Sequence, residues 1–459
     1  MIFTIGIMVI LIMGGILAWL WGRLPPELPW LYSLPWGEQQ LIKKEWFAGM
    51  LGGLLGLFIL TNFVSEWVGS NFGRWFDSSS NVSGRIFKSD RNNFRNMIPT
   101  AGITAVPFLI SFVLSLILTP LTIFLFTKKG WVIDPKKAPH PAHIHKEPVP
   151  KGGGLPILLA VGITALLLLD LDKHLVAILV AALITVIVGL IDDVRGINPY
   201  FRLGVNILSA LIIVISGIGI AFVSNPLGGV IDLSWPRLAI DFFGTHKEIW
   251  IIADLFALLW IPVLMNAINW SSGVDGQISG VVTIAAFVLG MISLSFSADI
   301  TQWPVATLAF ATAGAFLGLT VFHVYPQKIM PGYSATSLAG LLLGVISILA
   351  TAKVGALLVV LGVPFIDFVY IAIRRIVSGK SPVWGDKGHL HHKLLELGWS
   401  RRRVALFYWA ITGFLGIAAL NFHAQVKLSI IIVLALLMAG FLLWQYLARS
   451  SAQPGQRSG

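Results

Sequence analysis

The feature that most limits how this chain can fold is its succession of long apolar runs. They are continuous rather than alternating in polarity, and a helix satisfies its own backbone groups in lipid, so helices are favoured over a barrel. Of the 459 residues, 56% are hydrophobic and only 12% are charged, which is typical of an integral membrane protein. The sequence predicts an all-α fold, a polytopic membrane bundle of roughly 11 to 13 transmembrane helices. The runs begin near Ile2, Trp46, Met97, Gly153, His174, Leu203, Ile249, Ile278, Pro304, Ser334, Val354, Val404 and Leu428.

Composition along the chain predicts three parts. Residues 1–96 are expected to hold two amino-terminal transmembrane helices and a polar linker, because the segment Ser65–Arg95 is rich in Ser and Asn. Residues 97–447 form the main membrane domain, and residues 448–459 are expected to be a disordered tail. The first run lacks a basic start and a small-residue cleavage site, so a retained helix is favoured over a signal peptide. The absence of cysteine excludes disulfides, thiolate metal sites and a cysteine nucleophile.

The placement of positive charge predicts the orientation in the membrane. The net charge is +11, and most Lys and Arg residues of the main domain lie in the loops that also carry the polar motifs described below. The opposite loops hold few. The positive-inside rule therefore predicts that the motif-bearing loops are cytoplasmic. Because the charge is explained by topology, we expect no nucleic-acid partner.

Two adjacent carboxylates, Asp192 and Asp193, end the apolar run in the segment LIDDVRG. Adjacent carboxylates repel each other, so they persist best where a divalent cation or a base neutralises them, and oxygen ligands of this kind suit Mg²⁺. The alternative is a solvated helix end with Arg195 as the partner. Ionisable residues at a membrane edge generally serve function, so the functional interpretation is favoured.

Two glycine-containing loops on the same side place polar residues beside helix ends. HKEPVPKGGGLP offers Lys146 and Lys151 as cations and three glycines that would let backbone N–H groups approach a phosphate. NAINWSSGVDGQISG offers Asn269, Asp275 and Gly276 in a tight turn that could contact a base and ribose. Alone, the first loop is better explained as an ordinary basic loop, and the second is equally well explained as a helix-breaking turn.

A cluster of histidines marks the fourth loop, GDKGHLHHKLLELG. Its imidazoles, His389, His391 and His392, can bind phosphate oxygens, ligate a metal or move protons, and a single surface histidine would not explain three. Since all four loops share one predicted side, we expect them to converge on one site.

Together these segments resemble the polyprenyl-phosphate N-acetylhexosamine-1-phosphate transferase family (glycosyltransferase family 4). Its members include the phospho-N-acetylmuramoyl-pentapeptide translocase and the undecaprenyl-phosphate GlcNAc-1-phosphate transferases. The resemblance runs from about Met97 to Trp444 in the family's order. HLHH, rather than three consecutive histidines, is more similar to the GlcNAc-1-phosphate branch. The segments that carry it are HKEPVPKGGG, GLIDDVRG, NAINWSSGVDG, PFIDFVYIAIRR and GHLHHKLLELG.

The resemblance implies an enzyme that moves a sugar phosphate from a UDP-sugar to a polyprenyl phosphate, with release of UMP. The implied cofactor is Mg²⁺, with Mn²⁺ as the alternative. The implied place is the cytoplasmic face of the plasma membrane, at the first membrane step of cell-envelope polymer synthesis such as that of peptidoglycan. The implied partners are the UDP-N-acetylhexosamine donor, the polyprenyl phosphate acceptor and membrane lipids, and a homodimer is left open.

The resemblance also implies roles for individual residues. The implied catalytic residues are Asp192, Asp193, His389, His391 and His392. The implied substrate-binding residues are Lys146 for a phosphate, Asn269, Asp275 and Gly276 for the nucleotide, and Arg195. The implied metal ligands are Asp192, Asp193 and Asp275.

Two positions depart from the family pattern. Tyr333 stands where the family has an aspartate that is a principal metal ligand, and Ser272 stands where the nucleotide loop has a second aspartate. A neutral phenol is a poor Mg²⁺ ligand. Of the remaining acids in apolar runs, Asp254 is expected to be structural, and Asp367 either faces the site in a supporting role or pairs within the bundle.

Three interpretations therefore remain. The favoured one is an active transferase with a rearranged metal site. The second is a catalytically silent homologue that binds lipid phosphate or nucleotide and regulates or scaffolds the pathway. The third is a transporter or channel, against which stand the gathering of the acids in loops on one face and the lack of a visible inverted repeat.

Overall fold

The structure is a computed structural model that divides into two compact units, Met1–Ser111 and Phe112–Gly459. In the first unit, strands β1 (Glu27–Pro29) and β2 (Leu41–Lys43) form an antiparallel pair. The predicted helices that begin at Ile2 and Trp46, and the polar linker, lie outside the described residues, so the three-part division of the chain stays a prediction. The structure describes residues 27–29, 41–43, 100–133, 148–225, 229–242, 245–295, 302–350, 353–381 and 388–452.

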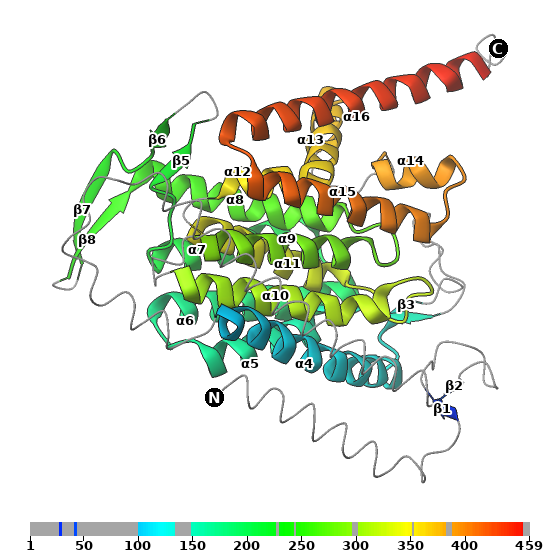
Figure 1. The fold of residues 1–459 in the computed structure, drawn as a ribbon, viewed down its shortest axis with the longest axis horizontal. Coiled ribbons are helices and arrows are strands. Elements are labelled where there is room, and N and C mark those ends of the chain that lie inside the picture. Colours follow the sequence, from blue (N-terminus) through cyan, green and yellow to red (C-terminus); the bar gives the residue numbers. More distant parts are fainter. Residues whose placement is uncertain are drawn as a thin grey trace. The chain divides into compact units, whose positions relative to one another are not determined.

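The rest of the described chain is dominated by helices (Figure 1). Each apolar run predicted from Met97 onward corresponds to one of these helices or, at Val354, to the pair α12 and α13. The helices are α4 (Thr100–Lys128), α5 (Gly154–Leu168), α6 (Lys173–Arg195), α7 (Pro199–Ile215), α8 (Ile251–Trp270), α9 (Gln277–Ser295), α10 (Gln302–His323), α11 (Gly332–Leu349), α12 (Val354–Val360), α13 (Gly362–Val377), α14 (Leu390–Glu396), α15 (Arg401–Asn421) and α16 (Ala424–Ala452).

Most of these helices can cross a membrane. Among the described residues, 8 helices are long and apolar enough, or 9 if α12 and α13, which bend by 88° at their junction, form one span. Helices α5 and α7 are apolar but shorter. The prediction of an all-α polytopic membrane protein is therefore confirmed. At the carboxyl end, α16 continues to Ala452, beyond residue 448, where the tail was predicted to begin.

The strands of the second unit form short antiparallel pairs. Strand β3 (Val132–Ile133) pairs with β4 (Val149–Pro150). Strands β5 (Phe222–Ser224) and β6 (Val230–Asp232) form one pair, and β7 (Arg237–Phe242) and β8 (Thr245–Trp250) form another. The last two pairs connect the end of α7 to the start of α8. They therefore lie at the opposite end of α8 from its last residues, which belong to the motif NAINW.

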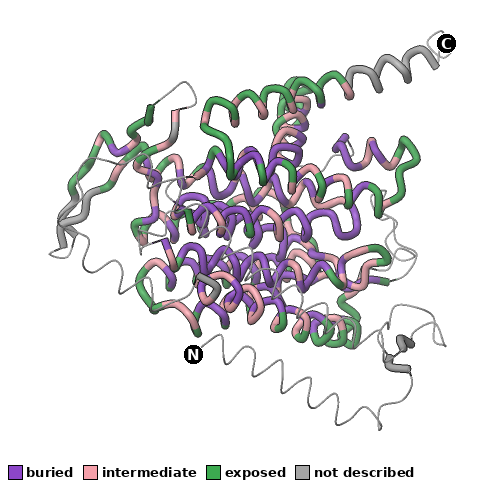
Figure 2. The backbone as a smooth tube through the Cα atoms, viewed as in Figure 1, coloured by how far each residue is buried: buried purple, intermediate pink, exposed green. Residues whose placement is uncertain are grey.

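Helix α11 lies at the centre of the second unit. It packs against α6 and α8 and is almost wholly buried, whereas the residues of α16 up to Phe441 are mostly exposed or half-buried (Figure 2). Helix α10, which packs against α5 and α9, is also largely buried. This packing holds the first turn of α11, which carries Tyr333, between the last turns of α6 and α8.

Candidate active site

The two adjacent acids at the end of α6 take different partners. Consecutive residues of a helix point about 100° apart, so their carboxylates diverge. Asp192 Oδ1 accepts the backbone N–H of Ile197 at 2.8 Å, and its Oδ2 accepts Nη1 of Arg202 at 3.2 Å. Arg202 reaches this acid because α7 begins immediately after α6. Asn198 caps α7 and Pro199 is its first residue, an arrangement that favours a helix start.

Asp193 is bound to the first turn of α11. Its Oδ1 accepts the Tyr333 N–H at 2.7 Å, and its Oδ2 accepts both the Ser334 N–H at 3.2 Å and the Ser334 hydroxyl at 2.6 Å. The first N–H groups of a helix lack partners within the helix, and its positive amino end favours a carboxylate. A Cβ at Gly332 would overlap this carboxylate. Asp193 therefore caps a helix whose first turn lies 140 positions further along the chain.

Tyr333 is buried beside Asp192 and Arg202. Its hydroxyl donates to Asn206 Oδ1 at 2.7 Å, and the guanidinium carbon of Arg202 lies 5.0 Å from the centre of its ring. The phenol thus serves as a hydrogen-bond donor to α7 and as an aromatic face for a cation. The guanidinium of Arg202 lies between the Asp192 carboxylate and this ring.

The glycines of HKEPVPKGGGLP also meet the start of α11. A Cβ at Gly153 would overlap the backbone of Pro331, and one at Gly154 would overlap Ser334. The Gly154 N–H donates to the Ser334 hydroxyl oxygen at 3.2 Å. These glycines permit close packing of α5 on α11, which is a different use from the phosphate approach that the sequence suggested. Lys146 lies outside the described residues.

Asn269 and Trp270 connect this region to the histidines. Asn269 Oδ1 accepts the Thr336 hydroxyl at 2.9 Å, which ties the end of α8 to the first turns of α11. The ring of Trp270 meets the ring of His389 edge-on, with 6.3 Å between their centres. Asn269 and Trp270 therefore connect the region of the paired acids to the histidine motif, although the two lie nearly 200 positions apart in the chain.

The three histidines form a compact cluster. The rings of His389 and His391 are parallel, with 5.4 Å between their centres, and His392 lies 4.3 Å from His391. Burial lowers the pKa of His391 well below its ordinary value, and the nearby imidazoles of His392 and His389 lower it further. His391 is therefore neutral at pH 7. Asp367 Oδ2 lies 2.7 Å from Nδ1 of His389.

The nucleotide-loop acid predicted from the sequence faces α15. Asp275 is buried, and its Oδ2 lies 3.3 Å from Nη1 of Arg401. The next residue, Gly276, has a φ of +80°, and its carbonyl accepts the indole N–H of Trp409 at 3.1 Å. Gly273 lies against the histidines, since a Cβ there would overlap the His391 ring.

The acids and histidines of this region could ligate a metal only if several of them were grouped. Among the described residues, no three His, Asp or Glu side chains are grouped so that they could hold a metal ion. Asp192 pairs with Arg202, Asp193 caps α11 and Asp275 pairs with Arg401. These residues do not fit a cation held by all three acids. The Mg²⁺ cofactor stays a prediction.

Several residues at this site were not singled out from the sequence. Arg202 takes the place beside Asp192 that the sequence suggested for Arg195, which is exposed at the end of α6. The start signal Asn198-Pro199, which puts Arg202 in the first turn of α7, could have identified it. No comparable signal marks the other partners, which are Asn206, Ser334, Thr336 and Arg401.

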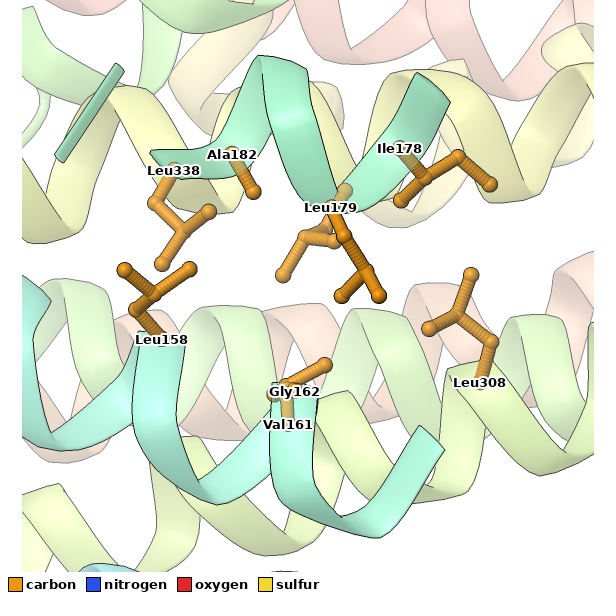
Figure 3. Close-up of a pocket in the computed structure, with 9 residues that line it drawn as sticks. Leu158, Val161, Gly162, Ile178, Leu179, Ala182, Leu308 and Leu338 are labelled. Carbon is orange, nitrogen blue, oxygen red and sulfur yellow. The ribbon is translucent and has the colours of Figure 1, made fainter. Parts of the chain in front are cut away.

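One small cavity lies between α5, α6, α10 and α11, away from these polar groups. Its volume is about 10 Å³, and its lining is apolar, including Leu158, Ile178 and Leu342. Figure 3 shows side chains of α5 and α6 facing one another across it. A space of this size accommodates no more than one water-sized sphere, so it is a packing gap and not a substrate site.

Comparison with known proteins gives consistent matches. The sequence model of the family described as Glycosyl transferase family 4 matches residues 175–351, which include both acids, the nucleotide loop and Tyr333. The chain is 30% identical over 311 residues to the decaprenyl-phosphate N-acetylglucosaminephosphotransferase of Mycobacterium leprae, covering 61% of this chain and 75% of that protein.

Two further relatives cover more of the chain. The probable undecaprenyl-phosphate N-acetylglucosaminyl 1-phosphate transferase of Bacillus subtilis is 27% identical over 344 residues, covering 72% of this chain and 89% of that protein. The phospho-N-acetylmuramoyl-pentapeptide-transferase of Bacillus velezensis is 27% identical over 330 residues, covering 70% of this chain and 97% of that protein.

Proposed function

Because this chain belongs to glycosyl transferase family 4, we propose that it transfers an N-acetylhexosamine 1-phosphate from a UDP-sugar to a polyprenyl phosphate and releases UMP. The observation that carries the proposal is the link made by Asn269 and Trp270 between the Asp193 contact with α11 and the histidine cluster. Polar groups that a sequence separates widely, and that a membrane bundle gathers at one edge, favour a site for charged substrates.

The donor that we propose is UDP-GlcNAc. Two of the relatives described above are named for GlcNAc phosphate transfer, and the histidine motif has the form HLHH. The acceptor that we propose is undecaprenyl or decaprenyl phosphate, as in the names of those relatives. The product would be the first lipid-linked precursor of a cell-envelope polymer.

The reaction joins two anions. An oxygen of the lipid phosphate attacks the sugar-bearing phosphorus of the donor, a new P–O–P bond forms, and the bond to the UMP oxygen breaks and leaves its electron pair on UMP. Positive groups at the site must offset the gathered charge. Arg202 is a fixed cation beside Asp192, and it is the residue to which we assign this role. The neutral His391 supports the ring of His389 without adding charge.

We also propose that the site faces the cytoplasm at the plasma membrane. The supporting observation is the excess of Lys and Arg in the loops at this end of the helices. A site at the membrane edge would let a lipid-bound acceptor meet a water-soluble donor.

The test is transfer of labelled phosphosugar to undecaprenyl phosphate by the purified full-length protein, with UDP-GlcNAc and UDP-MurNAc-pentapeptide as parallel donors. We expect product with UDP-GlcNAc and its loss in Asp193→Asn, because the amide would turn an N–H group toward the first turn of α11. Asp254→Asn is the matched control, since that acid lies at the opposite end of α8 and accepts the Trp250 N–H. No product with either donor, together with a gain of product in Tyr333→Asp, would overturn the proposal in favour of a silent homologue.

A further inference from the structure

The guanidinium of Arg202 contacts both Asp192, a predicted metal ligand, and Tyr333, which stands at the position of a further predicted metal ligand. Its Nη1 lies 3.2 Å from Asp192 Oδ2, and its carbon lies 5.0 Å from the centre of the Tyr333 ring. The Arg202 side chain keeps 26% of its surface exposed, against 10% for Asp192. The cation is therefore held from two sides and remains accessible from a third.

The oxygens that would serve a divalent cation here have other partners. Both oxygens of Asp193 accept hydrogen bonds from the first turn of α11. One oxygen of Asp192 accepts the Ile197 N–H, and the other accepts Nη1 of Arg202. Tyr333, at the position where the resemblance predicts an acid, donates its hydroxyl to Asn206. A divalent cation would have to share these oxygens with their present partners and would find no acid at position 333.

A guanidinium can provide the charge that such a cation would carry. It stays protonated at all physiological pH values, and its planar fork matches two oxygens of a phosphate. The contact with Asp192 uses one of its nitrogens, Nη1. The aromatic face of Tyr333 stabilises the cation and restricts its rotation. The group is thus oriented before any ligand binds, which lowers the entropic cost of binding.

We propose that Arg202, held by Asp192 and Tyr333, takes the place of the divalent cation, so that this chain binds the diphosphate of a nucleoside diphosphate without a divalent metal. The ligand class rests on the proposed function. The role of Tyr333 is then to support Arg202 through its ring.

The test has two readouts on the full-length protein in lipid nanodiscs. The first is calorimetric binding of UDP in EDTA and in Mg²⁺, and the second is binding of Mn²⁺ followed by its electron paramagnetic resonance signal. We expect the UDP dissociation constant to agree within about twofold between EDTA and Mg²⁺, and we expect no stoichiometric Mn²⁺ binding at the acids. Tyr333→Asp should gain Mn²⁺ binding, because it restores an oxygen ligand beside Asp192.

Variants connect the result to Arg202. Arg202→Ala should weaken UDP binding about tenfold or more in both buffers, as expected for the loss of charge-assisted hydrogen bonds. Arg202→Lys keeps the charge but loses the planar fork, so its affinity for UDP should lie between that of the natural protein and that of Arg202→Ala. The matched control is Arg237→Ala, which removes an arginine that also stacks on an aromatic ring, Trp250, but from β7 at the far end of α8. This variant should bind UDP as the natural protein does.

The outcomes separate this inference from the proposed function. Tighter UDP binding by tenfold or more in Mg²⁺, stoichiometric Mn²⁺ binding that Asp192→Asn abolishes, transfer that stops in EDTA, or no UDP binding in either buffer would each overturn the inference. UDP binding in EDTA that depends on Arg202, without any sugar-phosphate transfer, would support the inference and overturn the proposed function.

Discussion

Asp367 on α13 holds His389 by its Nδ1. The Asp367 Oδ2 lies 2.7 Å from that nitrogen, and the Oδ1 accepts the backbone N–H of Leu390 at 2.9 Å. Both side chains are buried, with 1% of Asp367 and 6% of His389 exposed. A carboxylate oxygen can only accept, so Nδ1 of His389 carries the proton of this hydrogen bond. The acid thereby sets the tautomer of His389 and caps α14.

Asp367→Asn should lower the turnover number for sugar-phosphate transfer about 10- to 100-fold, the range known for the loss of a carboxylate that orients a metal-bound histidine. The amide can keep the bond to Leu390 through its oxygen, but its NH₂ group would then face Nδ1 and favour the other tautomer. The labelled transfer assay, run across a pH series, checks this. Asp254→Asn is the control. A turnover number and pH profile equal to those of the natural protein would contradict a positioning role for Asp367.

Gly273→Ala should displace the His391 ring, because the added methyl group overlaps it. The expected cost in stability is about 1 to 3 kcal/mol, which is common when a methyl group is forced into a packed site. Thermal unfolding in detergent and the transfer assay should both show the loss. Gly413→Ala in α15 is the matched control, since a Cβ there has open space and a helical glycine gains stability as alanine. Equal melting temperatures for the two variants would refute the overlap.

The stability of the protein should fall in acid partly because of His391. Burial lowers its pKa in the folded state below the ordinary 6.5, and the neighbouring His392 and His389 lower it further. As the pH falls below about 6.5, the unfolded chain takes up a proton that the folded chain does not, so the free energy of unfolding decreases until the folded-state pKa is passed. Melting temperatures between about pH 8 and about pH 5 measure this.

His391→Gln removes this group and should make the melting temperature less dependent on pH over the same interval. The quantity compared is the slope of melting temperature against pH, which does not depend on whether the variant is less stable at every pH. Parallel pH profiles for the variant and the natural protein would show that His391 does not contribute.

Arg401→Ala should destabilise the protein by about 3 kcal/mol, because it leaves the buried carboxylate of Asp275 without its cation. The double variant Arg401→Ala with Asp275→Asn should recover part of this loss, since the buried charge is then gone. Thermal unfolding of the two single variants and the double variant gives the interaction free energy between Asp275 and Arg401. If Arg401→Ala keeps its stability and instead weakens UDP binding, Asp275 and Arg401 belong to the ligand site rather than to a structural pair.

The membrane helices of the main domain could be predicted from the sequence, and so could the segments that meet at the site. The NAINWSSGVDG loop and the HLHH segment do lie together, as the sharing of one predicted side suggested. The partners could not be predicted. The favoured prediction for Asp192 was a metal or substrate role, with Arg195 as its partner only in the alternative, whereas the structure pairs it with Arg202 of the next helix. Asp275 was expected to lie beside Asp192 and Asp193, whereas in the structure it pairs with Arg401 of α15.

The amino-acid sequence by itself determined that this chain forms membrane helices, because each apolar run satisfies its own backbone hydrogen bonds and is stable in lipid whatever its neighbours are. It also determined that the acids and histidines lie at helix ends. Only the tertiary structure decided which polar groups meet. Asp193 reaches the start of α11 because α6 packs on α11, and Asp367 of α13 meets His389 at the start of α14. A polar side chain in a bundle takes whichever partner the packing of neighbouring helices brings within about 3 Å, and that packing depends on contacts far apart in the chain.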